Sequence, residues 1–165
     1  MTKIAIFSDS HDNVWKLEKA LGQARELGAE ALLHCGDLCA PFNIKMMAEN
    51  FEGPIHLIFG NNDGDGRFIQ VLSSSYRHVT HHGQYAEITL FERKIAMIHY
   101  PEPALRIAQS GQFDLVCYGH DHTQRQERIG KTLLVNPGEL MGYWHESTWG
   151  LYDTDSGGFR WVEVV

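Results

Sequence analysis

Aspartate, asparagine and histidine side chains recur in short polar segments that follow apolar runs along this chain. These residues can ligate a metal ion or move a proton, and they are Asp9, His11, Asp37, Asn61, His99, His120 and His122. An isolated Asp-x-His pair is weak evidence, because a turn-forming aspartate beside a surface histidine gives the same pattern. Recurrence of such residues after several apolar runs favours metal binding, since histidine is the commonest metal ligand in proteins.

The seven candidate ligands supply nitrogen and oxygen donors and no thiolate. Mixed oxygen and imidazole donors suit manganese, iron, nickel or zinc. Seven donors are too many for one tetrahedral ion. If Asp37 bridges two ions, the set divides into two octahedral-like spheres completed by water. Two ions about 3.5–4 Å apart are the arrangement used for hydrolytic displacement at phosphorus.

The three cysteines favour an intracellular protein with reduced thiols. Cys35 and Cys39 could begin a zinc site, but no second pair completes four ligands. No apolar run approaches the roughly 20 residues that cross a bilayer, and the first apolar run meets Ser8 too soon for a signal peptide. We therefore expect a cytoplasmic protein with no membrane partner.

Length and composition predict one globular domain over residues 1–165. Hydrophobic residues make up 43% of the chain and charged residues 21%, so it can bury a core. Fourteen basic residues against 21 acidic ones give a net charge of −7, with histidine counted as neutral. This charge disfavours long nucleic acid as a partner, because generic attraction to the phosphate backbone needs a basic surface.

The first half of the chain alternates between expected strands and helices. Strands are expected at 3–7, 31–35 and 55–59, and helices at 14–27 and 42–50. Asn13 is a suitable N-cap for the first helix, and Gly28 a suitable stop. Such alternation predicts parallel strands joined by helices, with ligand sites beyond the carboxyl ends of the strands.

The second half is richer in strands. They are expected at 85–91 and 94–99 around a Glu92-Arg93 turn, at 115–118 and 132–135, and in a closing hairpin of 148–153 and 159–165, with one helix at 102–110. Together the two halves predict an α/β fold in which two sheets pack face to face with helices outside.

Five ordered sequence blocks resemble those of calcineurin-like metallophosphoesterases. The blocks are Asp9-Ser10-His11, Gly36-Asp37, Gly60-Asn61-Asn62-Asp63, the strand-end His99, and Gly119-His120-Asp121-His122. The resemblance is nearest to the small single-domain bacterial and archaeal phosphodiesterase branch, which Asn136-Pro137-Gly138 also resembles. It implies a four-layer α/β/β/α sandwich.

The resemblance also implies two metal sites. It assigns Asp9, His11, Asp37 and His122 to one ion, and Asp37, Asn61, His99 and His120 to the other. Mn²⁺ is the expected metal, with Ni²⁺, Fe²⁺ or Zn²⁺ as alternatives. A metal-bridging hydroxide would attack a small phosphodiester or phosphomonoester.

The resemblance makes Asn61, Asp63 and His99 the candidate catalytic residues. Asp63 and Asn13 are also suited to orient the metal ligands through hydrogen bonds. Asn62 departs from the family, because many members carry a histidine there that protonates the leaving group. Tyr100, in Tyr100-Pro101-Glu102-Pro103, either lines the substrate pocket or packs. Outside the blocks, His34 is expected in a buried strand, and His81, His82, Trp144 and His145 are interpreted as surface or core residues.

Two other functions are weighed against a phosphodiesterase. A non-catalytic metal-binding scaffold or protein-interaction module has a precedent in the retromer scaffold subunit that resembles this fold. A complete set of seven donors argues against that function. A nuclease is disfavoured by the acidic charge and the lack of a capping domain. A homo-oligomer is possible, although no residue pattern identifies an interface.

Overall fold

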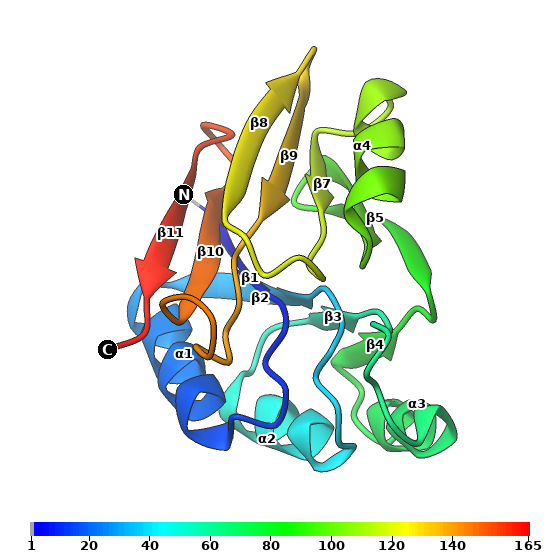
Figure 1. Cartoon of the computed structure of the whole chain (residues 1–165), viewed down its shortest axis with the longest axis vertical. Helices are drawn as coiled ribbons and strands as arrows, with labels where there is room; N and C mark the ends of the chain where they lie inside the picture. Colours follow the sequence, from blue (N-terminus) through cyan, green and yellow to red (C-terminus); the bar gives the residue numbers. More distant parts are fainter. Residues whose placement is uncertain (1) are drawn as a thin grey trace.

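The computed structural model describes residues 2–165, which form two mixed β-sheets and four α-helices (Figure 1). The first sheet has six strands in the order β11-β10-β1-β2-β3-β4, and the second has five in the order β5-β6-β7-β9-β8. The strands of the first sheet are β1 (Lys3–Phe7), β2 (Ala29–His34), β3 (Ile55–Leu57), β4 (Val79–His81), β10 (Thr148–Asp153) and β11 (Phe159–Glu163). Those of the second sheet are β5 (Tyr85–Leu90), β6 (Arg93–Ile98), β7 (Leu115–Cys117), β8 (Arg125–Ile129) and β9 (Thr132–Asn136). The helices are α1 (Val14–Glu26), α2 (Phe42–Asn50), α3 (Gly66–Ser74) and α4 (Pro101–Gln109).

Three apolar clusters separate four layers and confirm the predicted α/β/β/α sandwich. One lies between the first sheet and helices α1, α2 and α3, and includes Phe7 and Leu21. A second fills the space between the sheets, where Ile6 lies in the same cluster as Met97. The third joins α4 to the second sheet. Figure 1 shows α1–α3 on one side and α4 on the other. No helix within residues 2–165 is both long and apolar enough to span a bilayer.

Parallel pairing aligns the strand ends that carry the candidate ligands. Strand β1 is parallel to β2, which is parallel to β3, and in the second sheet β7 is parallel to both β6 and β9. The carboxyl ends of parallel strands lie at the same edge of a sheet. The loops that follow β1, β2, β3, β6, β7 and β9 can therefore meet.

Three elements lie outside the strands and helices expected from sequence: α3, β4 and β8. Strand β8 has the sequence Arg-Gln-Glu-Arg-Ile and β4 has only three residues; both are at sheet edges, where an apolar pattern is not required. Helix α3 is capped at its N-terminus by Asp65, whose side chain accepts a hydrogen bond from the Phe68 amide. The turn between β5 and β6 is Phe91-Glu92, so the expected Glu92-Arg93 turn was wrong by one residue.

Candidate metal centre

All seven candidate ligands converge where the loops that follow the parallel strands meet, and each one contacts at least one other. Asp9 and His11 follow β1, Asp37 follows β2, Asn61 follows β3, His99 follows β6, and His120 and His122 follow β7. The short distances between their polar atoms form an unbroken series in the order His122, Asp9, His11, Asp37, His99, Asn61 and His120.

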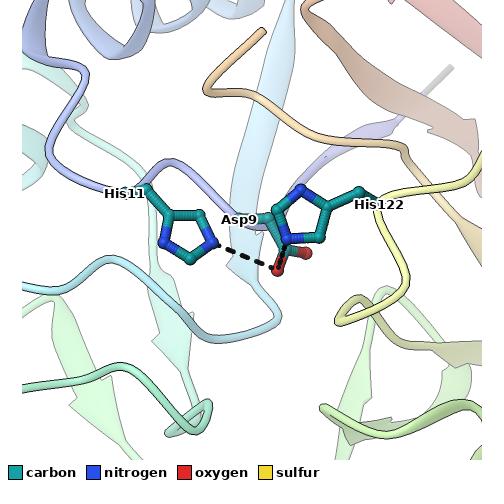
Figure 2. A group of neighbouring side chains, drawn as sticks. All are labelled: Asp9, His11 and His122. Atoms are coloured by element: carbon teal, nitrogen blue, oxygen red, sulfur yellow. Dashed lines mark ion pairs between the residues drawn. The ribbon is translucent and has the colours of Figure 1, made fainter. Parts of the chain in front are cut away.

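The first group consists of Asp9, His11 and His122. Oδ1 of Asp9 is 3.3 Å from Nε2 of His122 and 3.7 Å from Nε2 of His11. Figure 2 shows the carboxylate between the two imidazole rings, with a nitrogen of each ring directed at it. One ligand atom from each residue lies within 4.8 Å of the other two, which is close enough for one ion.

The second group is built around Asp37. Its Oδ2 lies 3.5 Å from Nε2 of His11 and 3.5 Å from Nε2 of His99, so one carboxylate oxygen faces both groups. Asp9, Asp37 and His99 also have ligand atoms within 4.8 Å of one another. Oδ1 of Asn61 lies 3.1 Å from His99 Nε2 and 2.8 Å from His120 Nδ1. Asp37 therefore has the central position that a bridging ligand requires.

Two buried polar atoms in this centre lack a hydrogen-bond partner within residues 2–165: Asp9 Oδ1 and His11 Nε2. An unsatisfied buried polar group costs about 1–3 kcal/mol, so such atoms are rare in folded proteins. The two atoms lie 3.7 Å apart, and a carboxylate oxygen and an imidazole nitrogen can both ligate a divalent cation. The residues present therefore fit a bound metal.

The carboxylates and imidazoles of the centre shift one another's pKa values. Burial acts to raise the pKa of Asp9, but the nearby imidazoles of His11 and His122 and the Ser8 hydroxyl hold it well below its usual range. Burial acts to lower the pKa of His11 and of His122, but Asp9 raises each to about 9. Asp37 follows the same pattern, with burial opposed by His99 and Asn62, and its pKa falls to about 2. The carboxylates therefore stay ionised at neutral pH.

Hydrogen bonds behind the ligands set the orientation of two imidazoles. Nδ1 of His99 lies 2.7 Å from the carbonyl oxygen of Cys35, and Nδ1 of His122 lies 2.5 Å from Oε2 of Glu139. Because a carbonyl or carboxylate oxygen can only accept, each Nδ1 must donate its proton. The opposite nitrogen, Nε2, is then left to bind a metal in the neutral ring.

Glu139 is a residue of the site that the sequence analysis missed. It is fully buried, its Oε2 faces His122, and its Oε1 accepts hydrogen bonds from three consecutive amides, those of Tyr143, Trp144 and His145, at 2.6–2.8 Å. Glu139 lies three residues beyond the end of β9. Its place after a strand of the same parallel set, next to Asn136-Pro137-Gly138, is the signal that could have identified it.

Asp63 and Asn62 both contact the Asp37 loop, in different ways. The Asp63 carboxylate accepts hydrogen bonds from the amides of Asp37, Cys39 and Gly60, so it holds the loops after β2 and β3 together. Burial raises the pKa of Asp63. Asn62 donates to both Asp37 oxygens, through its amide to Oδ1 at 2.7 Å and through Nδ2 to Oδ2 at 2.9 Å. The Asp63 side chain thus binds only backbone amides, whereas Asn62 binds the carboxylate of a candidate metal ligand.

The loops hold several ligands in a strained backbone conformation. Asp9, His11, Asp37, His120 and His122 all have positive φ, between 40° and 72°. Left-handed backbone costs a non-glycine residue on the order of 1–3 kcal/mol and persists where the surroundings enforce it. Two glycines permit the close packing: a Cβ at Gly60 would clash with the Asp37 carboxylate, and one at Gly119 with Ser8 and Asp9.

Aromatic rings flank the centre at both ends. Tyr100 packs edge-on against His99 and His120, with ring centroids 5.3 and 4.9 Å apart. Trp144 packs edge-on against His122 with centroids 4.7 Å apart. Trp144 and His145 are exposed, as expected of surface residues, and Glu139 also accepts hydrogen bonds from both of their backbone amides, which connects them to the centre.

The remaining residues singled out from the sequence lie outside the group of seven. His82 stacks on His56, and His81 packs against Phe59. His34 ends β2 and is fully buried, as predicted, and its Nε2 lies 3.0 Å from Ser10 Oγ. Asn13 caps α1, as predicted, and its Nδ2 donates to the carbonyl oxygen of Met141. It therefore ties the loop after β1 to the loop after β9.

Residues 2–157 match the family model described as the calcineurin-like phosphoesterase superfamily domain. The chain is 31% identical over 166 residues to phosphodiesterase MJ0936 of Methanocaldococcus jannaschii, covering 99% of this chain and 98% of that protein. These matches span nearly all of both chains, so they apply to the whole fold described above.

Two solved structures share this architecture. One, described as a novel archaeal phosphodiesterase, has a TM-score of 0.90 and 30% identity, covering 98% of this chain and 99% of the other. The other, YfcE, described as a phosphoesterase from E. coli, has a TM-score of 0.69 and 20% identity, covering 99% of this chain and 100% of the other. At that identity, the second likeness supports the fold alone.

Proposed function

The chain belongs to the calcineurin-like phosphoesterase superfamily, and from this premise we propose that it is a metal-dependent phosphodiesterase acting on a small phosphodiester. The 31% identical relative is itself named a phosphodiesterase. The observation that carries the proposal is the pair of buried atoms without a hydrogen bond, Asp9 Oδ1 and His11 Nε2, inside a ring of further candidate metal ligands. Such a ring is costly to fold and is explained by a cation that binds there.

Two divalent cations are assigned to the centre. Asp9, His11 and His122 would hold one, Asn61, His99 and His120 the other, and Asp37 would face both. When bound, such ions activate water and polarise the phosphoryl oxygens. Manganese is the proposed metal, because oxygen and neutral nitrogen donors suit it and no thiolate belongs to the set. Nickel, iron(II) and zinc are the alternatives.

The protein's own residues orient these donors and control their protons. Glu139 and the Cys35 carbonyl keep the Nδ1 protons of His122 and His99, which directs each Nε2 lone pair inward. Among the proposed catalytic residues, Asn61 and His99 reach the centre directly, and Asp63 acts by holding the loops of Asp37 and Gly60. No serine or cysteine nucleophile is required by this scheme.

The test is hydrolysis of bis(4-nitrophenyl) phosphate by chelator-stripped protein, with manganese, nickel, zinc, iron(II) and magnesium returned one at a time. We expect a transition metal to restore turnover in the wild type and Asp37→Ala to remain inactive with every metal. Metal content per chain is measured on the same samples. Folded wild-type protein that binds two ions but turns over no ester would contradict the proposal and would favour a non-catalytic metal-binding scaffold.

A further inference from the structure

We infer that the cavity beside His122 binds a planar aromatic group carried on one arm of the phosphodiester, with Trp144 as its contact surface. The inference rests on the proposed function and names a substrate class for the same site. The cavity has a volume of about 720 Å³, within the range of roughly 300–1,000 Å³ that small-molecule sites occupy. Its lining includes the candidate ligand His122 together with Thr123, Gln124, Gly138, Trp144, His145, Glu146 and Thr148.

The aromatic residues beside this cavity are unusually exposed. Trp144 is 63% exposed and its neighbour Tyr143 is 75% exposed, although each ring could bury a large apolar area. The Trp144 ring contacts His122 and Tyr143 by edge-on packing, with centroids 4.7 and 5.4 Å apart. A ring that adjoins a cavity and a candidate metal ligand is well placed to stack on a planar group of the substrate.

The segment that carries Trp144 is held in place. Oε1 of Glu139 accepts hydrogen bonds from the amides of residues 143–145, and the amide of Met141 donates to the carbonyl oxygen of Asp9 at 3.0 Å. The same carboxylate binds His122 through Oε2. The position of Trp144 is therefore set by the group that orients a metal ligand, which makes the aromatic surface part of a preorganised site.

The polar lining of this cavity favours an uncharged group over a second phosphate. It contains one carboxylate, Glu146, and neither lysine nor arginine, and of its two histidines His122 is a candidate metal ligand. Hydroxyl and amide groups of Thr123, Gln124 and Thr148 can instead serve neutral donors and acceptors. An uncharged aromatic arm suits these groups, whereas a nucleoside diphosphate or a longer strand would bring an unpaired negative charge against Glu146.

The test uses three phosphorothiolate diesters that release the same leaving group, ethanethiol, and differ only in the other arm: methyl, cyclohexyl or phenyl. The released thiol is measured with a thiol reagent on the metal-loaded enzyme. We expect kcat/KM to be about tenfold higher for the phenyl ester than for the methyl ester, which is ~1.4 kcal/mol, with the cyclohexyl ester between them. In Trp144→Leu this preference should fall to twofold or less, while Trp144→Phe retains part of it.

Controls separate loss of the aromatic surface from damage to the metal centre. In Trp144→Leu, turnover of the methyl ester and metal content per chain are measured alongside, because damage to His122 lowers both, whereas loss of the aromatic surface lowers the phenyl-to-methyl ratio. Phe91→Leu removes another exposed ring, in the turn at the far end of β6 from His99, and should leave every ratio unchanged. Equal loss on all three esters in Trp144→Leu would overturn the inference, because Trp144 would then act through His122.

Binding without turnover distinguishes failure of the inference from failure of the proposed function. Calorimetry with methyl(phenyl)phosphinate, whose two phosphorus–carbon bonds leave no ester to hydrolyse, should give a Kd about tenfold lower than with dimethylphosphinate, and Trp144→Leu should remove the difference. If no diester turns over but this difference is found, the proposed function fails and the aromatic site stands. Equal Kd values would overturn the inference whatever the activity. A 5′-adenosyl ester compared with the phenyl ester then tells a nucleoside ligand from a simple aryl ligand.

Discussion

Oε2 of Glu139 lies 2.5 Å from Nδ1 of His122, and both side chains are buried. Burial acts to raise the pKa of Glu139, but the hydrogen bond with His122 outweighs it and the pKa falls below its usual value. An ionised Glu139 cannot donate, so the proton between the two groups stays on Nδ1, both in the protonated ring and in the neutral ring that a metal requires. When the ring gives up its other proton, the pair therefore leaves Nε2 as the atom that can bind a metal.

Glu139→Gln should weaken metal binding although it preserves size and the acceptor at Oε1. If Oε1 of the glutamine continues to accept from the amides of residues 143–145, its NH₂ group faces His122 and donates to Nδ1. The imidazole proton then moves to Nε2, which can no longer ligate. We expect a 10–100-fold loss of affinity at one metal site, as found for such outer hydrogen bonds, measured by titration of the apoprotein. Glu163→Gln, an exposed carboxylate on β11, is the matched control.

Asp37 should matter to both metal ions, because its Oδ2 is equidistant from His11 and His99. We expect Asp37→Ala to lose both ions and His122→Ala to lose mainly one. Metal content per chain, measured after gel filtration, tests this difference. Asp65→Asn keeps the cap of α3 and should retain both ions. An Asp37→Ala protein with two ions and normal turnover would disprove the ligand assignment.

The stability of the metal-free protein should fall at alkaline pH, while its metal affinity rises. His11 and His122 have pKa values of about 9 in the folded protein against a reference of 6.5. The folded state holds these protons more tightly, so the stability they contribute is fully present below pH 6.5 and is lost as the pH rises through 9. Metals require the deprotonated rings, so their apparent affinity increases over the same window.

The melting temperature of the apoprotein, followed by circular dichroism from pH 6 to 9.5, measures how its stability changes with pH. A domain of this size changes by about 2–4 °C for each kcal/mol. Metal titrations at the same pH values measure how metal affinity changes with pH. We expect His122→Gln to flatten the decline in melting temperature, and a decline of equal size in that variant would show that His122 does not cause it.

The candidate ligands could be located from sequence because each follows an apolar strand of the parallel part of a sheet. That topology places Asp9, Asp37 and Asn61 at one edge whatever the details of the loops. Glu139 follows the same rule, yet a buried glutamate whose partner lies 17 residues away has no local signature. Trp144 was missed for a related reason: its position depends on hydrogen bonds from its amide and its neighbours' amides to Glu139.

The edge strands are a second part of the fold that the side-chain pattern does not predict. Strand β8 is predominantly polar, and only its pairing with the fully buried β9 makes it a strand. Backbone hydrogen bonds contribute to such pairing without regard to side-chain type, so no periodic pattern records it. The central strands, by contrast, are buried on both faces and appear as continuous apolar runs, which is why β1 was predicted with its actual bounds.

Asp63 is expected to act as a positioning residue. Removing its carboxylate in Asp63→Ala leaves three backbone amides without their acceptor, at a cost on the order of 1–3 kcal/mol for each unsatisfied group. We therefore expect a lower urea midpoint and weaker metal binding. Asp63→Asn keeps one acceptor oxygen and should recover part of both. Loss of turnover in Asp63→Asn with unchanged stability and metal content would indicate instead that Asp63 takes part in the chemistry.

Asn62→His should add a proton donor at a position where this chain has an amide. Asn62 already donates through Nδ2 to Asp37 Oδ2 at 2.9 Å, so a side chain at this position reaches the ligand that faces both metal sites. An amide cannot protonate a leaving group near neutral pH, whereas an imidazole can, and general acid catalysis typically contributes about 10²–10⁴-fold. We expect turnover of an alkyl phosphodiester, whose leaving group needs a proton, to rise at least tenfold relative to that of a 4-nitrophenyl diester. Asn62→Ala controls for loss of the hydrogen bonds to Asp37, and equal changes on both esters in Asn62→His would show that position 62 does not supply the proton.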